Sequence, residues 1–146
     1  MSTKIHTIYK KKNGTQVPGT TTILGLLDKP ALVHWAWEMG LKGEDYRKVR
    51  DQAASIGTIA HYLIQCFLTN IAPDLSDFTP NNLTQAKLAF DAFINFTRRY
   101  KLEIIKSELP LVSEEYNYGG TIDCYCKLDG RLALLDFKTS SGVYPE

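Results

Sequence analysis

Hydrophobic and polar positions alternate along residues 6–17, and the pair Asn13-Gly14 stands within this alternation. An Asn-Gly pair between two alternating segments is a strong signal for a β-hairpin. We therefore expect a small hairpin at the start of the chain. The next residues, Pro18 to Thr22, are predicted to form a loop.

Three later segments have helical features. A short helix is predicted from Lys29-Pro30 to Gly40, because proline favours the first turn of a helix and glycine its end. From about Asp45 to Asn70, and again from about Asn81 to Lys101, apolar residues recur every three or four positions. This spacing predicts two amphipathic helices, the first of which carries His61.

The period changes from helical to strand-like after Leu102. Three strands are predicted, at Ile104–Val112, Gly120–Leu128 and Arg131–Thr139. Helices followed by an antiparallel meander predict an α+β fold with the helices on one face of the sheet. A chain of 146 residues suits one domain, with a hairpin and short helix in residues 1–44, a helical part in 45–101 and the sheet in 102–146.

Charge and composition change this picture little. The chain has 17 basic and 16 acidic residues, so net charge alone does not predict a nucleic-acid partner. Basic residues cluster at residues 10–12, 47–50 and 98–101. Each cluster is either a local phosphate contact or an ordinary solvated surface, and the sequence leaves both open.

The cysteines and the hydropathy of the chain bear on its location. Cys66, Cys124 and Cys126 show no CxxC spacing, which argues against a disulfide framework and a zinc site and favours a reducing compartment. No apolar run approaches the roughly 20 residues that span a bilayer, and the start lacks the layout of a signal peptide. We expect a cytoplasmic protein with no membrane partner.

Asp129-Gly130 fixes the register of the last two predicted strands. A two-residue turn at this pair places Leu128 opposite Arg131 and, further along, Asp123 opposite Asp136. Like charges that face each other across a sheet are destabilising. We therefore expect a divalent cation between the two carboxylates, whose oxygens suit Mg²⁺ or Mn²⁺.

Strand alternation also assigns faces. Lys138 falls on the same face as Asp136, where its ammonium would orient an attacking water or stabilise developing charge. The other face is apolar and suited to packing on the helices; it carries Ile122, Cys124, Leu135 and Phe137. The alternative for Asp123, Asp136 and Lys138 is a surface cluster of salt bridges, which mimics a functional site.

The stretch GGTIDCYCKLDGRLALLDFKTS, residues 119–140, resembles the GxxD, DxK and Thr-Ser pattern of RecB-like members of the PD-(D/E)XK nuclease superfamily, and GTIAH, residues 57–61, resembles their GxxxH helix. This resemblance implies a restriction-endonuclease-like core that hydrolyses DNA with Mg²⁺ or Mn²⁺. It implies a metal site formed by His61, Asp123, Asp136 and the backbone carbonyl of Phe137, with Lys138, Asp123 and Asp136 as the catalytic side chains.

Three further residues are expected around this site. Glu108 resembles the acidic residue that precedes the GxxD strand in phage-type relatives, and its alternative is a solvent-facing strand residue. We expect Glu108 to support the metal ligands and not to bind the metal itself. The same supporting place is expected for Gly57, one turn before His61, and for Thr139.

The resemblance also has a departure. RecB-like relatives continue into a helix with a Gln and Tyr motif and usually another strand, whereas this sequence ends at Tyr144-Pro145-Glu146. We expect an exposed sheet edge that invites pairing with a second copy.

The sequence leaves two hypotheses for the function. One is a phage or bacterial exonuclease in DNA recombination or repair, and the other is a truncated or degenerate nuclease-like domain that binds DNA or a protein without cutting.

Overall fold

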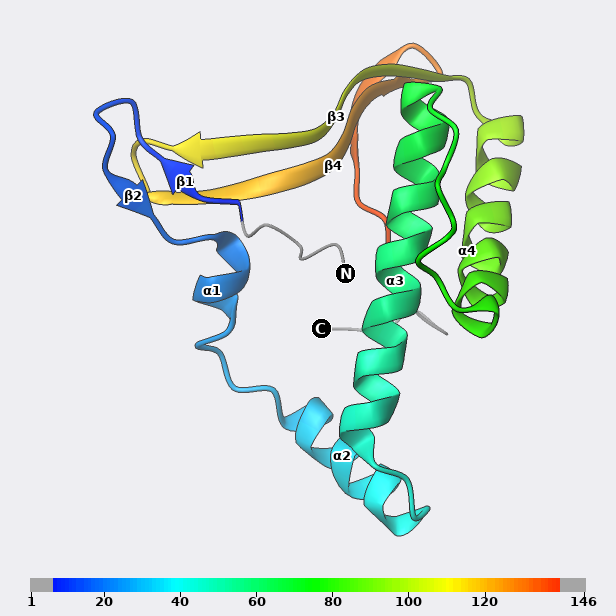
Figure 1. Cartoon of the computed structure of the whole chain (residues 1–146). Coiled ribbons are helices and arrows are strands. Elements are labelled where there is room, and N and C mark those ends of the chain that lie inside the picture. Colours follow the sequence, from blue (N-terminus) through cyan, green and yellow to red (C-terminus); the bar gives the residue numbers. More distant parts are fainter. Residues whose placement is uncertain (1–6, 140–146) are drawn as a thin grey trace.

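The computed structural model describes residues 7–139 and has an α+β fold, as predicted (Figure 1). The long strands β3 and β4 extend between a small hairpin at one end and two packed helices, α3 and α4, at the other. In chain order the elements are β1 (Tyr9–Lys10), β2 (Gln16–Val17), α1 (Thr20–Leu24), α2 (Pro30–Leu41), α3 (Tyr46–Thr69), α4 (Pro80–Arg99), β3 (Leu102–Ser113), β4 (Tyr118–Leu128) and β5 (Arg131–Leu135).

The amino-terminal hairpin is confirmed. Tyr9 pairs with Val17, and the loop is closed by a hydrogen bond from the Gly14 N–H to the Lys11 carbonyl at 2.9 Å. The loop spans residues 12–14 and not Asn13-Gly14 alone. It ends on Gly14 at φ 86°, the left-handed geometry that a three-residue hairpin loop requires at its last position.

The predicted loop from Pro18 to Thr22 is wrong, because Thr20–Leu24 forms the short helix α1. This segment is fastened to β4. The Gly119 N–H donates to the Pro18 carbonyl at 2.9 Å, and the Thr20 hydroxyl donates to the Gly119 carbonyl at 3.0 Å. The hairpin and α1 are thereby held against the start of β4.

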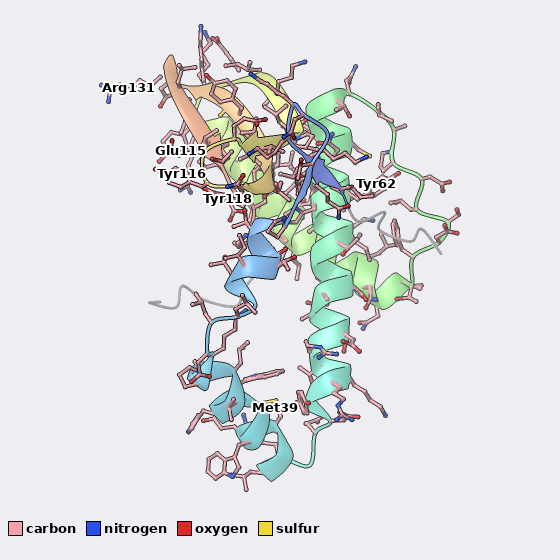
Figure 2. All side chains as sticks on the ribbon, turned by 90° about the vertical axis from the view of Figure 1, so that its left-hand side faces the viewer. Met39, Tyr62, Glu115, Tyr116, Tyr118 and Arg131 are labelled. Atoms are coloured by element: carbon pink, nitrogen blue, oxygen red, sulfur yellow. The ribbon has the colours of Figure 1, made fainter. Side chains whose placement is uncertain are left out.

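The helix α2 begins at Pro30 as predicted but passes through Gly40 and ends at Leu41. The residue that turns the chain is Gly43, at φ 74°, and the Glu44 N–H then donates to the Met39 carbonyl at 2.9 Å. Such a left-handed glycine after the last turn is a common helix end. Met39 points from α2 toward the first turns of α3 (Figure 2).

Both long helices are confirmed, and their ends have recognisable caps. The Asp45 carboxylate accepts the Arg47 N–H at 3.0 Å at the start of α3, which ends on Asn70 at φ 55°. The Thr79 hydroxyl accepts the Asn82 N–H at the start of α4. Each cap satisfies a backbone group that the helix itself leaves without a partner.

The apolar core lies between α3 and α4 and reaches the sheet through aromatic rings. Its buried members are Ile59, Ala60, Leu63 and Ala86. From there an aromatic chain runs from Phe67 through Phe93 to Phe137, whose ring centroid lies 5.3 Å from that of Phe93. The helices therefore support the carboxyl-terminal segment just beyond β5.

The sheet has the order β3-β4-β5, and all of its strands are antiparallel. Pairing from Leu128 with Arg131 to Cys124 with Leu135 confirms the register set by Asp129-Gly130. The predicted third strand is too long, however. β5 ends at Leu135 and not at Thr139, so Asp123 and Asp136 do not form the predicted cross-strand pair.

The prediction that Cys124 and Cys126 are core thiols is confirmed. Cys124 and Cys126 are fully buried, and burial together with the neighbouring Cys126 thiol raises the pKa of Cys124 to about 12. The Cys124 thiol is therefore protonated at neutral pH. The cysteines are structural residues and not nucleophiles.

The molecule is much less compact than its length suggests. The whole chain exposes 11366 Å², whereas a compact protein of this mass exposes roughly 7600 Å². Around α1 and α2, the apolar residues Leu26, Val33, Trp37 and Leu41 are exposed. None of the helices within residues 7–139 combines the length and hydropathy needed to cross a membrane.

Candidate metal centre

Three elements bring an imidazole and two carboxylates together. His61 comes from α3, Glu108 from β3 and Asp123 from β4, and one ligand atom of each lies within 4.8 Å of the other two. The His61 Nδ1 and Asp123 Oδ2 atoms are 3.9 Å apart. One nitrogen and carboxylate oxygens at this spacing are a plausible ligand set for Mn²⁺ or Mg²⁺.

Glu108 reaches this group through an irregularity in β3. Ser107 pairs with Cys124 and Leu109 with Ile122, so Glu108 lies opposite Asp123. Before the register shift between Ile104 and Lys106 the pairing is offset by one residue. Without that bulge, Glu108 would fall on the other face of the sheet, because a one-residue slip exchanges the two faces.

The backbone of Glu108 is also unusual. Its φ is 48°, in the left-handed region that a non-glycine residue rarely adopts inside a strand. Residues held in this way cluster at functional sites. Glu108, predicted from sequence only to support the ligands, thus lies among the three groups that are closest together.

His61 is oriented by a backbone carbonyl. Its Nε2 donates a hydrogen bond to the Phe137 carbonyl at 2.7 Å. A carbonyl only accepts, so Nε2 carries the proton and neutral His61 has a free lone pair on Nδ1, the atom nearer Asp123. Metal-binding histidines are commonly fixed by such a bond from the second ring nitrogen.

Asp123 is held by the same residue. Its Oδ2 accepts the Phe137 N–H at 2.7 Å, and its side chain is only 16% exposed. Phe137 thus contacts one candidate ligand through its N–H and another through its carbonyl. These two bonds turn the chain away from the β4 ladder, which explains why β5 stops before Asp136.

Gly57 allows the segment after β5 to approach α3 closely. A Cβ atom at residue 57 would lie 3.0 Å from the Thr139 hydroxyl oxygen, which is tighter than ordinary contacts. The predicted association of Gly57 and Thr139 with the site is therefore reflected in their position. Glycine in the GxxxH pattern is explained by this contact, one turn before His61.

Asp136 and Lys138 lie outside the group of three. The Lys138 ammonium contacts the Asp136 carboxylate at 2.7 Å, and these side chains are 74% and 65% exposed. They do share a neighbourhood, as predicted, but as a solvent-facing ion pair. The expected sharing of a cation between Asp123 and Asp136 is replaced by the opposition of Asp123 and Glu108.

Comparisons with known proteins do not identify a family for this chain. Neither the protein-family models nor the curated proteins gave a match. The resemblance described above therefore stays an interpretation of the motifs.

Each predicted basic cluster has at least one member that contacts a neighbouring polar group. Lys11 donates to the Asn117 amide oxygen at 2.6 Å, Arg50 contacts Asp51 at 2.7 Å, and Lys101 contacts Glu103 at 2.9 Å. Such exposed pairs contribute little to stability, and they reduce the positive field of each cluster. The clusters thus resemble ordinary surface charge more than a dedicated phosphate-binding surface.

Proposed function

We propose that this protein is a metal-dependent nuclease of the PD-(D/E)XK type that hydrolyses phosphodiester bonds in DNA. The observation that carries the proposal is the convergence of His61, Glu108 and Asp123 from three separate elements. Two of these residues occupy the GxxxH and GxxD positions of the resemblance. The motif spacing and the spatial convergence together support the proposal.

The ligand groups fit a divalent cation such as Mn²⁺ or Mg²⁺. His61 would bind through Nδ1, with carboxylate oxygens from Glu108 and Asp123 completing the protein ligands. The imidazole favours Mn²⁺ over Mg²⁺, which prefers oxygen. The Phe137 carbonyl, a predicted ligand, accepts the Nε2 proton on the side of the ring away from Nδ1, so in the proposed site it orients His61 and does not bind the same ion.

The reaction we propose needs no covalent protein intermediate. A bound ion would polarise the scissile phosphate and lower the pKa of a water molecule. Asp123 and Glu108 hold carboxylates at the site, while Lys138 supplies an exposed ammonium two residues beyond Asp136. In the proposed reaction this ammonium leaves Asp136 and stabilises negative charge that develops on the phosphate.

A second candidate is a nuclease-like module that binds DNA or a protein without cutting it. The specific observation in its favour is the Asp136–Lys138 pair, in which the two residues of the DxK motif neutralise each other outside the group of three. This candidate predicts metal binding without hydrolysis.

The deciding experiment combines cleavage with metal binding. End-labelled linear DNA and circular DNA are incubated with Mn²⁺, Mg²⁺ or a chelator, and Mn²⁺ binding is measured by calorimetry. We expect metal-dependent degradation, abolished in Asp123→Asn and retained in the control Asp91→Asn, an exposed change on α4. Degradation of the linear DNA but not of the circular DNA would indicate an exonuclease. Mn²⁺ binding without cleavage selects the second candidate, and absence of binding refutes the metal centre.

The setting we propose is DNA recombination or repair in the cytoplasm of a bacterium or a phage-infected host.

Self-association is a further part of the proposal. β5 is an edge strand whose Leu132 and Leu134 side chains are exposed, and such an edge invites pairing with a second chain. Sedimentation at several protein concentrations tests whether the chain is monomeric.

A further inference from the structure

A groove of about 760 Å³ lies between the hairpin, α1, the end of β3 and the first half of β4. Hydroxyl groups line it; they belong to Tyr9, Thr20, Thr21, Ser113, Tyr118 and Thr121. Asp136 also lines it, and the next residue in the chain, Phe137, bonds both His61 and Asp123. The groove therefore ends at residues that are next in the chain to the candidate metal centre: Ile122 precedes Asp123, and Asp136 precedes Phe137.

One side of the groove is a free stretch of strand edge. β5 pairs with β4 only from Cys124 to Leu128, and the segment before α1 meets β4 only at Gly119. Within residues 7–139, no strand pairs with that edge of residues 120–122. Its backbone groups are available to a ligand, as at any open sheet edge.

The shape of the groove depends on two glycines. A Cβ at Gly119 would lie 2.3 Å from the Tyr9 ring, and one at Gly120 would lie 2.9 Å from the Thr20 hydroxyl. Tyr9 also shares a hydrogen bond with the Thr121 hydroxyl at 2.9 Å. Thr121 lies two residues before Asp123, on the same face of β4, so these contacts shape the approach to the carboxylates.

We propose that this groove binds one strand of nucleic acid and leads its phosphodiester backbone to the metal centre. The inference rests on the proposed function and adds the location and the strandedness of the substrate. Hydroxyls and backbone amides would contact the phosphates and sugars, as such groups commonly do in nucleic-acid complexes. Tyr118, which is exposed at the groove, offers a surface on which a base can stack.

The size and chemistry of the groove favour a single strand. A volume of this order suits a small ligand, and hence a short stretch of nucleotides. A peptide added as a further strand is disfavoured, because the open edge at residues 120–122 is shorter than the usual strand of about five residues. None of the twelve residues that line the groove is basic.

The test measures binding without cleavage. A fluorescent oligonucleotide, single-stranded or duplex, is titrated with protein in chelator, and its anisotropy is recorded. Thr21→Trp fills the groove from α1, and its control Thr22→Trp changes the neighbouring exposed residue, which does not line the groove. Tyr118→Ala removes the stacking surface, and its control Tyr116→Ala removes an exposed tyrosine from the nearby turn (Figure 2).

We expect the single strand to bind more tightly than the duplex. Thr21→Trp and Tyr118→Ala should weaken binding about ten-fold, while both controls bind like the parent. The ratio of the affinity of the parent protein to that of each groove variant should be the same at low and high salt, because the groove contributes no basic side chain. Circular dichroism of all four variants confirms folding before binding is compared.

The outcomes separate the groove from the nuclease. Normal affinity in both groove variants overturns the inference even if the parent protein cleaves DNA. A stronger affinity for duplex, or no affinity for either form, overturns it as well. Selective loss in the two groove variants supports it even if no cleavage is ever detected, in which case only the nuclease proposal fails.

Discussion

The two halves of the candidate site differ in how firmly the fold holds them. His61 and Asp123 are 32% and 16% exposed, and hydrogen bonds to one backbone residue orient both. Asp136 and Lys138 are 65% and 74% exposed, and the contacts that hold them are mainly with each other. The first half is arranged before any ligand arrives, whereas the second is arranged by a weak surface pair.

In the proposed nuclease, metal binding and catalysis would therefore depend on different parts of the chain. The ligands belong to α3, β3 and β4, which are long and packed elements. The DxK residues follow the end of β5, where the ladder has already stopped. We therefore expect substitutions in the two halves to affect different measurements.

The largest effect is expected from Lys138→Ala. Removing a cation that stabilises charge on the reacting phosphate should lower the cleavage rate about 10² to 10³-fold and leave Mn²⁺ affinity unchanged. Lys87→Ala, an exposed change on α4, is the control. Single-turnover cleavage and calorimetry provide the two readouts. A parallel loss of metal affinity would show that the two halves are not separable.

A smaller effect is expected from Glu108→Gln, and it concerns metal affinity where that of Lys138→Ala concerns the cleavage rate. Mn²⁺ affinity should fall about 10 to 10²-fold, because one carboxylate facing Asp123 is neutralised. Without metal the same change should raise Tm by a few degrees, since it removes repulsion between opposed carboxylates.

Asp136→Asn is the matched comparison for Glu108→Gln. It removes a charge from the exposed pair with Lys138 and should change Tm and Mn²⁺ affinity much less. Thermal melts and Mn²⁺ titrations of both variants test this comparison. If Asp136→Asn costs more metal affinity than Glu108→Gln, the ligand set originally predicted from sequence is the correct one.

Gly57→Ala should have a modest effect that isolates the contact between α3 and the segment after β5. Replacing a glycine inside a helix by alanine normally stabilises the folded protein by about 0.5 to 1 kcal/mol. Gly40→Ala should show this gain, because nothing lies within 4 Å of its added Cβ. At Gly57 the crowded Thr139 hydroxyl should offset the gain and lower cleavage a few-fold. Equal stabilisation of both variants would show that the close approach does not matter.

The effect expected at neutral pH is smallest for the ionisation of the buried Cys124 thiol. The pKa of Cys124 is raised from 9.0 to about 12, so folding favours its protonated form. Its contribution to stability is therefore complete below pH 9 and decreases as the pH rises from 9 toward 12. Denaturant unfolding should show a steeper alkaline loss for the parent than for Cys124→Ala. Identical pH profiles would contradict the assigned burial.

Much of the fold was predictable because local signals determined it. The two long helices have clear periodicity and caps, and Asp129-Gly130 fixes the β4–β5 register through a turn with φ of 49° and 81°. The position of His61 and the buried face of Cys124 follow directly from these elements. They require no knowledge of distant contacts.

The parts that escaped prediction depend on tertiary contacts. The bulge near Ile105, which places Glu108 opposite Asp123, has no glycine or proline to mark it. The early end of β5 depends on the bonds of Phe137 to Asp123 and His61. The helix α1 is held by Gly119, about a hundred residues away along the chain. In each case the deciding partner is remote in sequence.

The peptide groups of Phe137 make this site observable in solution. Because its N–H is bound to Asp123 and its carbonyl to His61, one backbone residue senses both candidate ligands. Its amide proton should exchange slowly with solvent, and its resonance in a proton–nitrogen NMR spectrum should shift when Mg²⁺ enters the centre. A single backbone signal would then report occupancy of the centre without any measurement of catalysis.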